Sequence, residues 1–134
     1  MQKFNIPCKI SCACIRPLSF FEGEIIIIQN PEETALLDEI QPGMTIGFDS
    51  EARPSFRKGE HYPISLVQIS TEDKAFLVRV NKVGIPSQLI RILTSEKIIK
   101  IGLGLKAEIK ELEKTGGRSC NGFVDLEPIA QKLK

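Results

Sequence analysis

Residues 46–54 constrain the fold of this chain more than any other segment. They read Ile-Gly-Phe-Asp-Ser-Glu-Ala-Arg-Pro, which predicts a strand that ends at two acidic residues. Side chains alternate between the two faces of a strand, so Asp49 and Glu51 are expected to point the same way. Two carboxylates this close repel each other unless a cation lies between them, and such oxygen ligands suit Mg²⁺ or Mn²⁺. The alternative is an ordinary solvated strand end.

The size and charge of the chain indicate one domain with a balanced surface. Its 134 residues, 42% of them hydrophobic, are enough to bury a single core. A formal net charge of +1 argues against a partner held mainly by a broad basic surface. The apolar run at residues 25–28 is only as long as a strand, and prolines and cations interrupt any signal-peptide core. We therefore expect a soluble cytoplasmic protein that does not span a membrane.

The cysteines do not predict a metal site. Cys8, Cys12 and Cys14 have a spacing that matches no common zinc-binding pattern, and the single histidine, His61, is remote in sequence. Cys120 lies far from all three. We expect free thiols in a reducing compartment, and we assign these residues no role.

The order of the predicted elements indicates an α/β fold. Residues 1–22 predict an irregular leader, and residues 23–134 predict one domain. Strands are expected at residues 24–29, 44–51, 64–70, 74–80, 97–101 and 123–126, and helices at 30–40, 86–93, 106–114 and 127–134. A hairpin followed by strands that alternate with helices is typical of a mixed sheet with helices packed on it.

A strand that runs through Gly-x-Gly directly into a helix is the second informative segment. These glycines, at residues 102–104, are too few for a dinucleotide-binding fingerprint. In the helix, Leu105, Ile109 and Leu112 form the expected buried stripe. Glu108 borders this stripe near the start of the helix, so we expect its carboxyl group on the same side of the sheet as the acidic pair. The alternative is a boundary residue that reaches into solvent.

Five segments, taken in order, resemble a known family. The segments are residues 47–54 (GFDSEARP), 65–70 (SLVQIS), 75–78 (AFLV), 100–108 (KIGLGLKAE) and 123–126 (FVDL). They resemble the 3'-5' exonuclease domain of the ribonuclease D and Werner-syndrome exonuclease type, in the DEDD superfamily. The resemblance covers about residues 24–134. It implies a ribonuclease-H-like mixed sheet with flanking helices, acting on DNA or RNA 3' ends.

The resemblance also implies a mechanism and a set of ligands. Members of the family cleave phosphodiester bonds with two divalent ions, Mg²⁺ or Mn²⁺, held about 4 Å apart by four acidic residues. Asp49 matches the ligand that bridges both ions, and Glu51 matches the ligand of the ion that activates water. The acid of the second motif falls on Glu108, where the family has Asp. Asp125 matches a structural position of the family and not a ligand.

The third motif of the family, Tyr-x-x-x-Asp, is not found after Asp125. The single tyrosine is Tyr62, and Glu127 is the one acid after Asp125. The sequence therefore predicts a C-terminally truncated domain with impaired exonuclease activity. The alternative is a non-catalytic nucleic-acid-binding remnant of the same fold. A domain truncated in this way is expected to expose apolar surface and to self-associate.

A basic loop follows the acidic strand and is a candidate contact for nucleic acid. Arg53, Arg57 and Lys58 supply cations for backbone phosphates, and Phe56 can stack on a base. The alternative is a solvated basic loop whose Phe56 is tucked into the core.

Overall fold

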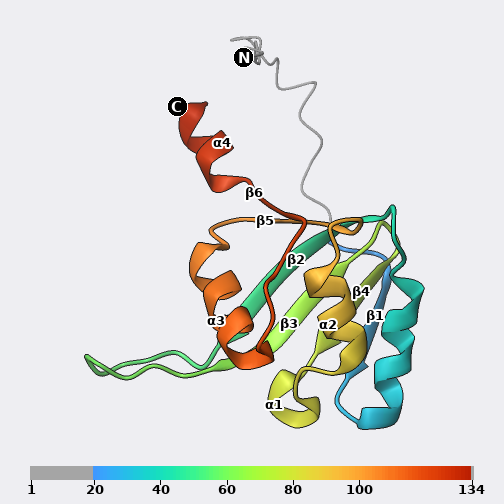
Figure 1. Ribbon diagram of the computed structural model, residues 1–134, viewed down its shortest axis with the longest axis horizontal. Coiled ribbons are helices and arrows are strands. Elements are labelled where there is room, and N and C mark those ends of the chain that lie inside the picture. The colour runs from blue at the N-terminus through green and yellow to red at the C-terminus, as the bar shows by residue number, and fades with distance from the viewer. Residues whose placement is uncertain (1–19, 134) are drawn as a thin grey trace.

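A six-stranded mixed sheet forms the centre of the computed structural model, which describes residues 20–133 (Figure 1). The strands lie in the order β1-β4-β3-β2-β5-β6. Their bounds are β1 (Glu24–Ile28), β2 (Thr45–Ala52), β3 (Ile64–Ser70), β4 (Lys74–Val78), β5 (Ile99–Gly102) and β6 (Phe123–Asp125). Most of the predicted leader, including Cys8, Cys12 and Cys14, lies outside the described residues.

Strand directions place β2 near the middle of the sheet. β2, β3 and β4 form an antiparallel meander, while β5 runs parallel to β2, β6 parallel to β5 and β1 parallel to β4. The helices are η2 (Pro31–Glu39), α1 (Val80–Val83), α2 (Ser87–Thr94), α3 (Lys106–Gly116) and α4 (Glu127–Lys132). The expected mixed α/β architecture is confirmed.

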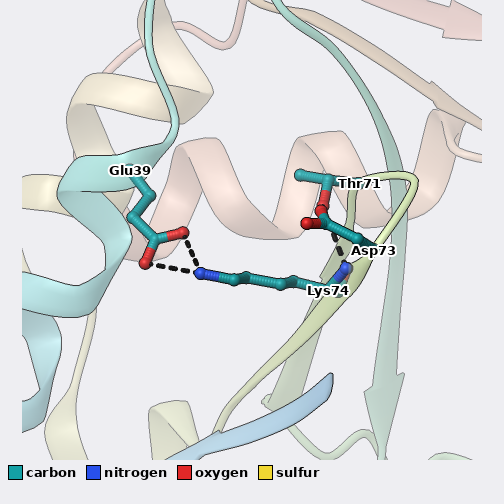
Figure 2. A network of polar contacts seen from close by, with 4 residues as sticks. All are labelled: Glu39, Thr71, Asp73 and Lys74. Carbon is teal, nitrogen blue, oxygen red and sulfur yellow. Dashed lines mark hydrogen bonds and ion pairs between the residues drawn. The ribbon is translucent and has the colours of Figure 1, made fainter. Parts of the chain in front are cut away.

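The turn between β3 and β4 closes the predicted hairpin, and a salt bridge ties it to η2 (Figure 2). The Thr71 hydroxyl donates to the Asp73 carboxylate at 3.0 Å and accepts the Lys74 backbone N–H at 3.1 Å. The Lys74 ammonium group donates to both carboxylate oxygens of Glu39, at 2.7 and 2.8 Å. This contact raises the pKa of Lys74. The hairpin is therefore held at its tip and against the helix that follows β1.

Two local features differ from the sequence prediction. Residues 31–39 form a 3-10 helix, and β4 ends at Val78, two residues before its predicted end, because the short helix α1 begins at Val80. The start of η2 nevertheless has the capping interactions that are typical of its sequence. The Glu33 carboxylate accepts the backbone N–H groups of Gln29 and Asn30 at 2.8 and 2.9 Å, which lowers the pKa of Glu33.

The hydrophobic core lies on one face of the sheet. Strand residues of this face pack with apolar side chains from η2, α1, α2 and α3, and the fully buried members include Ile28, Val67, Ile69, Phe76, Val78, Leu37, Leu89, Ile92 and Leu105. We call this side the covered face. Within the described residues, no helix is long and apolar enough to cross a membrane.

The opposite side of the sheet, here called the open face, carries no helix among the described residues. The strand pairings place on it Ile25, Ile27, Thr45, Gly47, Asp49, Glu51, Leu66, Gln68, Ser70, Ala75, Leu77, Ile99, Ile101 and Val124. Ile25 and Ile27 remain 58% and 52% exposed, although both belong to a strand. Residues 20–133 therefore bury one side of the sheet and leave the other side uncovered.

Candidate active site

The acidic pair lies on the open face at the end of β2. Asp49 faces Gln68 and Glu51 faces Leu66 across the β2–β3 ladder, and both acids are exposed. Ser50, between them, is only 5% exposed because it points to the covered face. The ladder becomes irregular between Glu51 and Ala52, which marks the end of the strand. The prediction that Asp49 and Glu51 share a face at the end of a central strand is confirmed.

A shallow hollow of about 280 Å³ lies beside Asp49 on the open face. Its polar lining comes from Gln68 and Ser70 of β3, which sequence reasoning left out of the site. A Cβ atom on Gly47 would collide with the Ser70 hydroxyl, so glycine keeps this approach open. The alternation of polar Gln68 and Ser70 with apolar residues along β3 was the one sequence signal for these two residues, and it is also typical of any half-exposed strand.

The turn that leads from β5 into α3 is held by Asp125. The Asp125 carboxylate accepts the backbone N–H groups of Gly104, Leu105 and Glu127, each at 2.9 Å. These hydrogen bonds lower the pKa of Asp125, and the bond from the Glu127 N–H has the largest effect. Asp125 thereby joins β6 to the start of α3. This geometry agrees with the structural role that the family resemblance implies for it.

Glu108, on the first turn of α3, approaches β2 from the covered face. Its Oε2 atom and the Ser50 hydroxyl are both buried, and neither has a hydrogen-bond partner of good geometry among residues 20–133. Burial raises the pKa of Glu108, the negative charges of Asp49 and Glu51 raise it further, and the nearby Ser50 hydroxyl partly offsets the rise. The three acids are thus close enough to influence one another.

The expectation that Glu108 shares one side of the sheet with the acidic pair is wrong. Helix α3 buries Leu105 and Leu112 against the covered face, and Glu108 lies one turn along the same side of the helix. Asp49 and Glu51 belong to the open face. Within the described residues, no three His, Cys, Asp or Glu side chains are arranged as a group able to hold a metal ion. The assignment of Asp49, Glu51 and Glu108 as metal ligands stays a prediction.

The basic loop forms an arm that extends away from the sheet between β2 and β3 (Figure 1). Its candidate contact residues, Arg53, Phe56, Arg57 and Lys58, are all exposed. Phe56 is 91% exposed, so the alternative that this ring is tucked into the core is wrong. At the base of the arm, the Arg53 guanidinium lies 4.9 Å from the centroid of the Tyr62 ring. We call residues 53–63 the basic arm.

A groove of about 550 Å³ separates the base of the basic arm from α3. The arm contributes His61 and Tyr62 to its walls, and the helix contributes Glu108, Glu111 and Lys114. Sequence reasoning gave no role to His61, Tyr62 or Lys114, because no local motif links them. Glu108 therefore lies in a groove whose opposite wall is the base of the basic arm.

The model of the 3'-5' exonuclease domain family matches residues 25–134, which is most of the chain. The chain belongs to this 3'-5' exonuclease family. A 3'-5' exonuclease of Arabidopsis thaliana is 29% identical over 89 residues, which cover 65% of this chain and 31% of that protein. The chain therefore spans about a third of the length of this curated relative.

Solved structures of exonuclease domains share the fold. The Aedes aegypti Nibbler exonuclease domain has a TM-score of 0.68 at 19% identity, over 89% of this chain and 60% of its own. The EXD2 exonuclease domain has a TM-score of 0.66 at 26% identity, over 82% of this chain and 60% of its own. Trypanosoma brucei RNase D in complex with RNA U12 has a TM-score of 0.66 at 20% identity, over 79% and 38%. These similarities confirm the ribonuclease-H-like fold.

Proposed function

We propose that this exonuclease-family chain takes part in two-metal hydrolysis of nucleic-acid phosphodiester bonds from the 3' end. The observation that carries the proposal is the pair of exposed carboxylates, Asp49 and Glu51, on one face at the end of the central strand. Neither acid forms an ion pair with another described residue. Two adjacent, unneutralised carboxylates on a strand of this family fit the binding of Mg²⁺ or Mn²⁺.

The remaining residues fit such a site only in part. Glu108 contributes a carboxyl group whose charged form is disfavoured by burial and by Asp49, so a nearby cation would favour its ionisation. It reaches β2 from the covered face, and we propose that it acts through bound water. When bound, divalent ions activate a water and stabilise the leaving oxygen. Asp49 and Glu51 would hold the ions on the open face, and the hollow lined by Gln68 would admit the substrate.

We propose nucleic acid as the substrate, contacted by the basic arm. Arg53, Arg57 and Lys58 project into solvent where they can meet backbone phosphates, and Phe56 offers an exposed ring for stacking. Two relatives support this choice. A Trypanosoma brucei RNase D structure contains RNA U12, and an EXD2 exonuclease domain was soaked in Mg and GMP. We propose a cytoplasmic site of action and self-association as further properties.

We propose that activity is impaired in these 134 residues. The Tyr-x-x-x-Asp motif is missing from the sequence, and Glu108 replaces the expected Asp. Two-metal hydrolysis depends on metal ligands and an attacking water that are held in position. The missing motif and the longer Glu108 side chain are therefore each expected to raise the activation barrier of hydrolysis. A second candidate function, nucleic-acid binding without cleavage, is favoured by the lack of a three-acid cluster among residues 20–133.

Incubation with 5'-labelled single-stranded DNA and RNA tests the two functions. We expect a slow, Mn²⁺-dependent ladder of shortened products that is lost in Asp49→Ala and retained in Asp38→Ala. Asp38 is an exposed acid on η2, remote from the site, and serves as the matched control. Binding of the strand without shortening, unchanged in Asp49→Ala, would support the non-catalytic function instead.

A further inference from the structure

The groove between the basic arm and α3 lies next to the end of the acidic strand. Ala52, the residue after Glu51, belongs to its lining, and α3 lines it along about two turns, from Ala107 to Lys114. Figure 1 shows α3 beside the base of the arm. The volume of about 550 Å³ is in the range of binding sites for small organic ligands.

One aromatic ring in the wall of the groove is held in place by its neighbours. Tyr62 lines the groove and is half-buried. Its hydroxyl donates to the Glu60 carboxylate at 3.2 Å, and the Arg53 guanidinium lies over the ring, 4.9 Å from its centroid. A ring that is fixed before binding loses little freedom when a base stacks on it. Tyr62 is therefore suited to stack on a nucleobase.

Three lysines form a row along the exposed side of α3. Lys106, Lys110 and Lys114 are all exposed and follow one another at four-residue spacing. Within residues 20–133, none of the three forms a salt bridge. Like charges at this spacing destabilise a helix, and Lys106 also opposes the helix dipole in the first turn. A row that lowers the stability of the helix fits a surface that binds anions.

The acids of α3 limit where a phosphate can bind. Glu108 and Glu111 line the groove together with Lys114. The remaining acid of the helix, Glu113, accepts the Cys120 backbone N–H at 2.8 Å and does not line the groove. Carboxylates repel a phosphate, but they accept the N–H groups of a base edge. A base is therefore expected inside the groove and its phosphate on the rim, where Lys114 begins the lysine row.

We propose that the groove is a subsite for one nucleotide of a single strand, with the base stacked on Tyr62 and the phosphate bound by Lys114. Phosphates farther along the strand contact Lys110 and Lys106. The subsite rests on the proposed function, because its ligand is the same single-stranded nucleic acid. It is a separate contact from the basic arm, since α3 supplies its cations.

Fluorescence anisotropy of a labelled single-stranded oligo-dA, in EDTA over a series of salt concentrations, tests the subsite. We expect Lys114→Ala to weaken binding and to reduce the slope of log affinity against log salt by about 0.7, the contribution of one phosphate contact on a single strand. Lys97→Ala is the matched control. Lys97 is exposed, and its carbonyl accepts the Gly43 N–H beside the start of β2, at the end of that strand opposite to the groove.

Substitutions of Tyr62 separate stacking from charge. We expect Tyr62→Leu to weaken binding about fivefold or more with an unchanged salt slope, because a stacked base contributes no counterion release. Tyr62→Phe retains the ring and is expected to bind as the wild type does. Circular dichroism verifies that each variant is folded. A reduced salt slope in Tyr62→Leu would attribute the loss to displacement of Arg53 and would overturn the stacking role.

Failure of the subsite is distinguishable from failure of the proposed function. If Lys114→Ala and Tyr62→Leu bind as the wild type does while Arg57→Ala binds more weakly, the groove is not a nucleotide subsite and the contact of the basic arm stands. If the wild-type chain binds no single strand, the subsite and the proposed nucleic-acid function are both wrong.

Discussion

The ammonium group of Lys100 lies 5.0 Å from the centroid of the Phe123 ring, inside the core. Phe123 meets Phe48 edge-on, with ring centroids 5.0 Å apart, and Phe48 directly precedes Asp49. Lys100 is fully buried and donates to the backbone carbonyls of Ile92 and Ser95, each at 2.8 Å. The buried ammonium group of Lys100 therefore links the end of α2 to the Phe123 and Phe48 rings, which pack on the covered face of the sheet.

Burial of Lys100 predicts a rise in stability between about pH 8 and pH 10. Burial lowers the pKa of Lys100 to about 8, whereas an unfolded lysine titrates near 10.5. In this range the unfolded chain binds more protons than the folded chain, so the free energy of unfolding increases with pH. The full difference corresponds to about 3 kcal/mol. Urea unfolding at a series of pH values measures it.

Lys100→Met provides the control for this pH dependence. It leaves two carbonyls without a donor and is expected to cost about 1–3 kcal/mol at neutral pH. It should nevertheless remove the rise above pH 8. Burial raises the pKa of the Cys120 thiol, which gives a pH dependence of opposite sign, so both proteins are compared in a Cys120→Ala background. A rise that persists in Lys100→Met would contradict the assignment.

Mn²⁺ is expected to bind weakly to the wild-type chain and more weakly still to Asp49→Ala. Two exposed carboxylates and one from the covered face leave most of the coordination shell to water. Isothermal titration calorimetry measures both affinities, with Asp38→Ala as a control for general loss of charge. Equal Mn²⁺ affinities of wild type and Asp49→Ala would exclude Asp49 as a ligand.

Glu108→Gln is expected to stabilise the fold at neutral pH by about 1 kcal/mol, because the amide can donate to the buried Ser50 hydroxyl without a charge. The raised pKa of Glu108 means that the wild-type chain loses stability as pH rises above the ordinary carboxyl range. The substitution should remove that loss. Thermal unfolding at acidic and neutral pH measures it, and destabilisation at neutral pH would be the contrary result.

Phe56→Ala is expected to weaken single-stranded nucleic-acid binding by about 1–3 kcal/mol, the value of one base stacked on an aromatic ring. Because Phe56 is 91% exposed, the free energy of unfolding should not change. Fluorescence anisotropy with a labelled oligonucleotide measures the affinity. Phe20→Ala is the matched control, since Phe20 is 95% exposed and lies before β1. An unchanged affinity of Phe56→Ala would show that the Phe56 ring does not contact the nucleic acid.

The sequence predicted those features that depend on local pattern. The strand at Ile64–Ser70 was predicted at its observed bounds, because alternation and turn residues both mark it. The shared face of Asp49 and Glu51 followed from the two-residue period of a strand. The stripe of Leu105 and Leu112 on α3 followed from helical spacing in the same way.

The side from which Glu108 reaches the sheet could not be predicted, because it depends on which face α3 covers. Helical spacing placed Glu108 beside the buried stripe, but the same spacing fits packing on either face. The Asp125 bonds that set the path of the chain into α3 join residues about twenty positions apart. The groove beside Tyr62 likewise joins an arm and a helix that share no local motif.

The parallel pairing of β1 with β4 has a consequence for synthesis of the chain on the ribosome. Glu24 pairs with Lys74, so the partner of β1 is made about 50 residues later. Synthesis proceeds at roughly 5–20 residues per second, so the four isoleucines of β1 remain unpaired for several seconds before β4 has been made. The β2–β3–β4 meander, whose contacts are local, is expected to form first. During that interval the four isoleucines of β1 are exposed, and such apolar segments are bound by chaperones or can associate with other nascent chains.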